Sequence, residues 1–399
     1  MTATISRRLP GLTHLRRLTD DTGITEHALG KISRRKEGYS TDDQARALWA
    51  SLELLELSGE QDRPLLLTLI DTYLAFMLWV QKEDGHFHNN IAYDRSKEPE
   101  VPSEDCLGRC LWSSALAYCR LEDPGRRLAA EALLAHSLPL VSTLRTPRGW
   151  AHALAALGLL KRHGYHDGRI HGAAAASAFS AELADSAIQE LTRRLKQSYR
   201  SHAAADWQWY EAEMTYSNGL LPWGMLWAYE STGDREALDT ALSSLDFLIL
   251  RSRSPKGHHI RPIGNRGWCS RHSRALWDQQ PIDVMKLMLA CIKAGELTGE
   301  IRYRETARAC HAWFYGDNDA GVPLADHEEG SCCDGLQECG ANLNRGAEST
   351  ISYLLAEVMY EGHLANEKQP WENKLKKTMN IEAVEEGKRK VDSHREITS

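Results

Sequence analysis

Carboxylates recur at the starts of predicted helices in this sequence. The stretches GYSTDDQARAL, PSEDCLGRCLW, WDQQPIDVMKL and NLNRGAESTISYLL each place an acid in a first turn. These acids are Asp42, Asp43, Asp105, Asp283 and Glu348. A single acid at a helix start is ordinary capping, because it complements the helix dipole. The repetition, with Arg46 and Arg109 following an acid on the same helical face, indicates a shared site.

A second group of acids lies among aromatic rings, in DWQWYEAEMTYSNG. Two carboxyl groups are enough to hydrolyse a glycoside, one as acid and the other as base or nucleophile. Trp209 and Tyr210 flank Glu211, and we expect their rings to desolvate it and so favour its protonated form. Glu211 is therefore the candidate general acid, with Glu213 as a weaker rival. The candidate bases are Asp105 first, then Asp43 and Asp283.

Polar and aromatic side chains gather around these acids on long loops and helix starts. Such side chains hydrogen-bond sugar hydroxyl groups and stack on sugar faces. The chain also has 12 Trp and 13 Tyr against 5 Phe. The binding candidates are Asp42, Arg46, His88, Asn89, Arg109, Trp207, Trp209, Tyr216, Asn218, Arg266, Trp268, Gln279, Gln280, Asp334, Asn344 and Glu348.

Helical periodicity covers most of the chain, and strand signals are almost absent. We expect about twelve helices, near 12–29, 40–59, 64–83, 105–121, 125–145, 147–163, 174–199, 217–232, 234–252, 281–298, 300–315 and 346–360. Long loops at 84–104, 200–216, 253–280 and 316–345 alternate with tight turns, so in antiparallel helices they meet on one face. The pattern predicts an all-α fold, an (α/α)6 toroid of six helical hairpins. Residues 1–364 form one domain, and 365–399 form a polar tail, partly helical or disordered.

The composition excludes several classes of protein. A formal net charge of -7 and a pI near 6.2 argue against nucleic-acid binding. No apolar run approaches the ~20 residues of a membrane span, and the opening MTATISRRLPGL does not resemble a secretory signal. The nine cysteines form no disulfide framework, so we expect reduced thiols in the cytoplasm. No cofactor motif is present.

Four alternatives remain open at this point. A zinc site would use the cysteines at 269, 332, 333 and 339 with His272, but their spacing matches no strong metal signature. A sugar epimerase or isomerase would need a histidine pair from His86, His88, His258, His259 and His272. A glycoside phosphorylase would need an anion pocket built from Arg261, Arg266 and Arg271. A non-catalytic glycan-binding module would not need acids at so many helix starts.

The motifs GYSTDDQARAL, DGHFHNNIAYDR, SEDCLGRCLW, DWQWYEAEMTYSNGLLPWGML, IGNRGW, DQQPID, CDGL and NRGAESTISYLL occur in an order that resembles a bacterial family. That family is described loosely as glycosyltransferase-like and is often encoded beside mannoside phosphorylases. The resemblance covers about residues 10–362. More distantly, the chain is similar to α/α-toroid glycosidases. The resemblance implies carbohydrate chemistry in the cytoplasm.

Common donor-sugar transferases use parallel-sheet nucleotide-binding folds, and nothing in this sequence predicts a parallel sheet. We therefore expect a glycoside hydrolase that cleaves a short oligosaccharide, a mannoside or a glucoside. Inversion of the anomeric centre is favoured, but the separation of the two carboxyl groups decides it.

Overall fold

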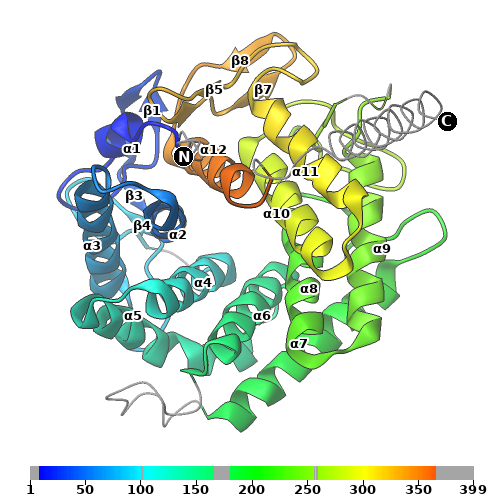
Figure 1. Ribbon diagram of the computed structural model, residues 1–399, viewed down its shortest axis with the longest axis horizontal. Coiled ribbons are helices and arrows are strands. Elements are labelled where there is room, and N and C mark those ends of the chain that lie inside the picture. Colours follow the sequence, from blue (N-terminus) through cyan, green and yellow to red (C-terminus); the bar gives the residue numbers. More distant parts are fainter. Residues whose placement is uncertain (1–8, 100–101, 166–179, 256, 258, 365–399) are drawn as a thin grey trace, which may run out of the picture.

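Six helices form a closed inner ring in the computed structural model, which describes residues 9–99, 102–165, 180–255, 257 and 259–364. Each inner helix packs against the next, and the last packs against the first (Figure 1). The inner helices are α2 (Thr41–Leu57), α4 (Glu104–Arg120), α6 (Pro147–Arg162), α8 (Leu220–Thr232), α10 (Pro281–Thr298) and α12 (Ala347–Met359). The predicted all-α toroid is confirmed.

An outer layer of antiparallel helices covers the ring, and each outer helix packs on the inner helix that precedes it in the chain. The outer helices are α3 (Arg63–Val80), α5 (Pro124–Ser137), α7 (Ala181–His202), α9 (Arg235–Arg251) and α11 (Ile301–Phe314). The short α1 (Thr13–Leu18) packs on α12. Because every inner helix runs in the same direction, the inner N-termini meet on one face of the toroid.

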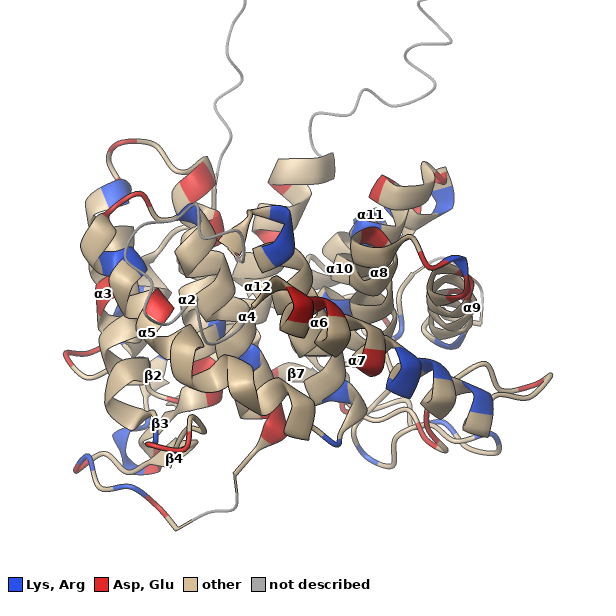
Figure 2. Ribbon diagram, turned by 90° about the horizontal axis from the view of Figure 1, so that it is seen from below, with Lys and Arg blue, Asp and Glu red and all other residues tan. Residues whose placement is uncertain are grey.

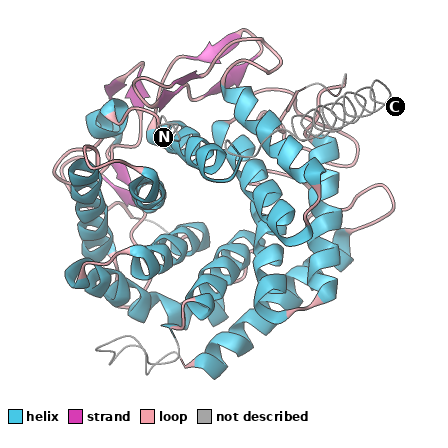
Figure 3. Cartoon of the chain, viewed as in Figure 1, coloured by secondary structure: helices cyan, strands magenta, loops and turns pink. Residues whose placement is uncertain are grey.

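Short β-ribbons decorate the long loops (Figure 3). Each is an antiparallel pair of strands two or three residues long. The pairs are β1 (Ala28–Leu29) with β2 (Ile32–Ser33), β3 (Tyr39–Ser40) with β4 (Asn90–Ile91), β5 (Ala325–Asp326) with β6 (Ser331–Cys332), and β7 (Gly335–Gln337) with β8 (Gly340–Asn342). Two of these ribbons lie in the loop before α12, and β3–β4 joins the chain before α2 to the loop before α4. The ribbons β3–β4 and β7–β8 lie on the face that carries the inner N-termini.

Two predicted helices are too long. The N-terminal helix stops at Leu18 rather than residue 29, because the Asp20 carboxylate accepts hydrogen bonds from the backbone N–H groups of Thr22 and Gly23 and forms a turn. The helix that begins at Pro124 ends at Ser137 and continues as a 3₁₀ segment to Thr143, since Pro139 cannot donate a helical hydrogen bond. The predicted tail, 365–399, lies outside the described residues.

Tryptophan rings fill the middle of the inner ring. Trp112 packs edge-on against Trp223, with ring centroids 4.8 Å apart, and against Trp49 at 5.6 Å. Trp227 joins the cluster, and each of these four residues is no more than 5% exposed. Edge-to-face contacts of this kind add about 0.5–1.5 kcal/mol beyond area burial. Part of the tryptophan excess is therefore core packing rather than sugar contact.

Among the described residues, one helix is long and apolar enough to cross a membrane by length and composition, contrary to the sequence-based expectation. It is α3, whose apolar window has a mean hydropathy of 1.4 and is 44% buried. In the toroid α3 packs on α2 and α5. A core helix of a soluble protein passes the same test, so this finding is weak evidence for a membrane.

Candidate active site

A polar cavity of about 360 Å³ opens at the N-termini of α2 and α12. The ribbons β3–β4 and β7–β8 contribute side chains to its wall. Its lining consists of Glu26, His27, Ser40, Asp42, Asp43, Arg46, Asn89, Asn90, Asp278, Gln280, Asp334, Asn342, Gly346, Glu348 and Ser349. The long loops and the inner helix starts therefore converge, as the alternation of connections predicted.

Buried ion pairs hold the acids at the helix starts. Arg46 Nη1 lies 2.5 Å from Asp43 Oδ1, and its Nη2 lies 2.9 Å from Glu348 Oε2. Arg109 Nη1 donates to Asp42 Oδ1 at 2.7 Å. Both arginines are 7% exposed, so their contacts with Asp43 and Asp42 are shielded from solvent screening, whereas the Glu348 side chain is 41% exposed. The network joins α2 to α12 and α4 to α2.

The same network continues around the ring to Glu211. Arg109 lies 3.7 Å from Asp105, which also accepts a hydrogen bond from the Tyr216 hydroxyl. The Tyr216 ring stacks under the guanidinium of Arg148, 4.4 Å from the ring centroid. Arg148 in turn donates to Glu211 Oε2 at 3.0 Å. Sequence reasoning missed Arg148, because no acid stands near it in the chain.

Glu211 does not have the environment that was expected. Trp209 and Tyr210 are fully buried in the core, but the Glu211 carboxyl group is not buried with them. The Glu211 side chain is 29% exposed and is paired with Arg148. The physical reason for choosing Glu211 as the general acid is therefore wrong, and neither Glu211 nor Asp105 lines the cavity. Glu213 does not line it either.

Burial and neighbouring charges shift the pKa values of the two adjacent acids, Asp42 and Asp43, in opposite directions. Burial raises the pKa of Asp43 to about 7 despite Arg46, and the neighbouring carboxylates of Glu348 and Glu26 add to the rise. For the adjacent Asp42, Arg109 and Arg46 outweigh burial and hold its pKa below the usual range. The expectation that first-turn acids are all favoured as anions fails for Asp43, because desolvation exceeds the dipole effect.

Asp283, in the first turn of α10, also has a raised pKa. Burial raises this pKa to about 7. Its Oδ1 accepts from the backbone N–H of Asn218 at 3.3 Å and from the side-chain amide at 3.4 Å. Its Oδ2 is buried with no hydrogen-bond partner. Asp283 does not line the cavity. The Asn218 side chain hydrogen-bonds to Asp283 rather than facing the cavity.

A basic layer lies one helical turn below the acids. Lys286 follows Asp283 by three residues and places its Nζ 4.6 Å above the Trp49 ring. Burial, with Arg109 and Arg46 nearby, lowers the pKa of Lys286 well below its usual value. The inner helices therefore present acids first, basic groups next and tryptophans deepest.

Two of the aromatic binding candidates are core residues. Trp207 and Trp209 are fully buried, so neither can stack on a ligand. The Trp207 indole donates to the backbone carbonyl of Glu211 at 2.8 Å, and its ring packs against Phe247. The partly exposed rings near the acids are instead Tyr216 and Trp268, whose centroids are 6.4 Å apart. The local spacing of rings and acids could not show which rings point inward.

Several polar candidates hold the loops together instead of facing the cavity. Gln279 is fully buried, where it donates to Asp319 at 2.6 Å and accepts from the Trp313 indole at 3.2 Å. Asn344 accepts from the backbone N–H of Gly30 at 3.0 Å. The binding prediction for Gln279 is wrong, because its buried amide is fully engaged by loop groups. Asn344 is partly exposed and does not line the cavity, so its binding role stays a prediction.

The remaining candidates divide between the cavity and its surroundings. Asn89, Gln280 and Asp334 line the cavity. Arg266 is exposed and lies 3.5 Å from Asp278, which lines it. His88 does not line the cavity, although its backbone carbonyl anchors Thr41 at the start of α2.

Sequence reasoning also missed several lining residues, namely Glu26, His27, Ser40, Asn90, Asp278 and Asn342. Most of them lie on the ribbons or just before an inner helix, outside the first turns that the periodicity identified. The ribbon pairing of Ser40 with Asn90 brings two of them together, and no local pattern signals that pairing.

The structure bears on the alternative chemistries. Within the described ranges, no group of three or more His, Cys, Asp or Glu side chains is placed to hold a metal. Of the histidines that the structure describes, only His27 lines the cavity, and His258 lies outside the described residues. Arg261 pairs with Asp319, and Arg271 donates to a backbone carbonyl elsewhere. In the described ranges, the other histidines and Arg261, Arg266 and Arg271 therefore do not line the cavity, and the epimerase and phosphorylase chemistries stay as alternatives.

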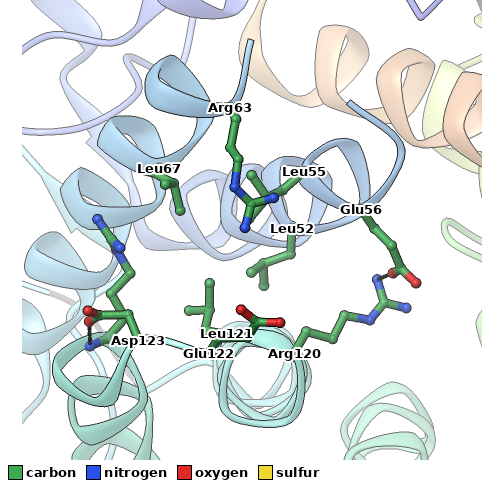
Figure 4. Close-up of a pocket in the computed structure, with 10 residues that line it drawn as sticks. Leu52, Leu55, Glu56, Arg63, Leu67, Arg120, Leu121, Glu122 and Asp123 are labelled. Carbon is green, nitrogen blue, oxygen red and sulfur yellow. Dashed lines mark hydrogen bonds and ion pairs between the residues drawn. The ribbon is translucent and has the colours of Figure 1, made fainter. Parts of the chain in front are cut away.

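A further cavity, of about 400 Å³, lies at the opposite end of the helices (Figure 4). Leucines from α2, α3 and the end of α4 form its floor, and Arg120 pairs with Glu56 at its edge. It is remote from the acid-bearing helix starts, so its size alone does not make it the candidate site.

No protein-family model matches the chain, and no curated protein matches its sequence. Solved structures share its fold at low identity. Cellobiose 2-epimerase from Bacillus thermoamylovorans is 10% identical with a TM-score of 0.66, over 88% of this chain and 95% of that one. The GH76 α-mannanase of Bacteroides thetaiotaomicron is 12% identical with a TM-score of 0.57, over the same shares.

A third neighbour, a cellulase from C. cellulolyticium in complex with cellobiose, is 8% identical with a TM-score of 0.54, over 86% of this chain and 88% of that one. All three neighbours are carbohydrate-active α/α-toroid enzymes. At these identities the likeness establishes the fold, and the chemistry has to be argued from the cavity.

Proposed function

We propose that the protein is a glycoside hydrolase that cleaves a short oligosaccharide in the cavity at the start of α2 and α12. The observation that carries this proposal is the pair of adjacent carboxyl groups, both lining the cavity, whose pKa values are moved in opposite directions. Glycoside hydrolysis requires one carboxyl group that holds its proton and one that does not.

The roles follow from the two environments. Asp43, with a pKa near 7, can protonate the leaving oxygen at neutral pH. Asp42, held as the anion by Arg109, can act as base or nucleophile. Asn89, Asn90 and Gln280 supply amides for sugar hydroxyl groups. The three sugar-processing neighbours support the substrate class but do not distinguish hydrolysis from epimerisation.

The compartment is also part of the proposal. All nine cysteines are unpaired, which supports a reducing, cytoplasmic environment, as the sequence led us to expect.

The decisive experiment incubates the protein with manno- and gluco-oligosaccharides, with and without phosphate, and identifies products by mass spectrometry. Hydrolysis predicts shorter sugars in both conditions. If sugar phosphates form, and only when phosphate is present, the reaction is phosphorolysis and not hydrolysis. Interconversion without cleavage would favour the epimerase alternative.

A variant experiment assigns the acid. The Asp43→Asn variant should lose about 10²–10⁴-fold in turnover while still binding sugar. Asp21→Asn is the matched control, because Asp21 is 83% exposed on the surface. Turnover by Asp43→Asn at the parent rate would refute the acid assignment.

A further inference from the structure

The lining of the cavity is strongly acidic and contains no aliphatic or aromatic side chain. Six carboxyl groups face it, and its basic lining residues are Arg46 and His27. The six are Glu26, Asp42, Asp43, Asp278, Asp334 and Glu348. A ligand in this cavity meets far more negative than positive charge.

Neutralisation of these acids within the described part of the chain is incomplete. Arg46 is shared between Asp43 and Glu348. Asp334 accepts from the backbone N–H of Gly346 and from the Ser349 hydroxyl, each at 2.6 Å, and both donors are uncharged. Glu26 lies 3.6 Å from His27, and Arg46 also acts on it from further away. Arg109 and Arg266 pair with Asp42 and Asp278, so the six acids share three arginines.

This crowding raises the pKa values of two of the acids. Burial raises the pKa of Glu26, His27 and Arg46 oppose the rise, and Asp42 and Glu348 add to it. Asp43 is affected in the same way by Glu348 and Glu26. A positive charge placed beside these carboxyl groups would stabilise the ionised form of Glu26.

The geometry points to a cation carried by the ligand itself. No group of three or more acidic, histidine or cysteine side chains in the described ranges is placed to coordinate a metal. Amide and hydroxyl groups of Ser40, Asn89 and Asn342 surround the acids and suit a polyhydroxylated ligand. We propose that the cavity recognises an amino sugar, with its ammonium group held beside Glu26 and Glu348. This inference rests on the proposed function and names its substrate class.

The test compares three β-1,4-linked disaccharides that differ only at C2: chitosan disaccharide with an ammonium, cellobiose with a hydroxyl, and diacetylchitobiose with an acetamide. Binding is measured by calorimetry at pH 7 and low salt. The ammonium sugar should bind at least about tenfold more tightly than cellobiose, because hydrogen bonds between charged groups are the stronger kind. Added salt should reduce this preference.

Two further measurements locate the effect. Glu26→Gln should remove most of the ammonium preference. Glu305→Gln, a change to an exposed residue of α11 that does not line the cavity, should leave the preference intact.

Equal affinity for the ammonium sugar and cellobiose would overturn the inference, as would a preference unchanged in Glu26→Gln. A calcium-dependent, EDTA-sensitive preference for neutral sugars would assign the positive charge to a metal and also overturn it. Hydrolysis of neutral oligosaccharides without ammonium preference would leave the proposed function standing alone. Ammonium preference without any cleavage would refute the proposed hydrolase and retain the binding site.

Discussion

Asp43 is the residue on which the proposed chemistry depends, because its proton must be present when the leaving oxygen departs. With a pKa raised to about 7, Asp43 loses that proton as the pH rises through neutrality. We predict that kcat/KM falls on the alkaline side with an apparent pKa near 7. The measurement is a pH–rate profile on a cleaved oligosaccharide.

Arg46 provides a check on the same assignment. Its guanidinium lowers the pKa of Asp43 against the effect of burial. Arg46→Gln should therefore move the alkaline limb of kcat/KM to higher pH. A limb that stays in place would show that a group other than Asp43 controls it.

Glu211 tests the acid that sequence reasoning favoured. Because Glu211 is paired with Arg148 and lies outside the cavity lining, Glu211→Gln should keep kcat within about tenfold of the parent, far above Asp43→Asn. Steady-state kinetics on the same oligosaccharide decides between them. If Glu211→Gln and Asp43→Asn lose kcat equally, Glu211 again becomes a candidate for the general acid.

At the scale of elements, the inner helices pack without room for added atoms. A Cβ on Gly224 of α8 would lie 2.6 Å from the Ala151 Cα of α6. Gly224→Ala should thus lower the free energy of unfolding by about 1–3 kcal/mol, measured by urea denaturation. Gly59→Ala is the control, since nothing lies within 4 Å of its added Cβ and its effect should stay below about 1 kcal/mol. Equal effects would contradict the close α6–α8 contact.

At the scale of the whole molecule, the face bearing the inner N-termini carries the acids and the ribbons, and the tryptophan cluster lines a separate cavity of about 200 Å³ toward the other end of the ring. Figure 2 shows β2, β3 and β4 together at one end of the toroid. Gathering acids on one face of a closed ring costs folding stability, because buried carboxyl groups must stay protonated or find cations. The stability of the fold should therefore depend on pH.

Asp283 makes this dependence measurable. Its folded pKa is about 7, against about 3.9 in the unfolded chain. Between these values the folded protein holds a proton that the unfolded chain has released, so the free energy of unfolding falls as the pH rises from about 4 to about 7. The Asp283→Asn variant lacks this titrating group, so its free energy of unfolding should decrease less with pH than that of the parent. The variant should therefore become more stable relative to the parent between pH 5 and pH 8.

Urea unfolding at the two pH values measures the difference. Asp239→Asn, at an exposed position of α9, is the control and should follow the parent at both pH values. A parallel decline in Asp283→Asn and the parent would mean that Asp283 does not carry this proton.

Local pattern was enough to predict the helices, their alternation with long loops, and the gathering of acids on one face. Periodicity and turn residues act over a few positions, so they can be read along the chain. The spacing of Asp43 with Arg46 likewise predicted a real ion pair.

Tertiary structure alone decided which of these groups face the cavity. It buried Trp207, Trp209 and Gln279, brought Arg148 to Glu211, and added Glu26 and Asp278 to the wall. It also set the opposite pKa shifts of Asp42 and Asp43. Burial and charge proximity depend on segments far apart in the chain, and their effects at one residue have no local signature.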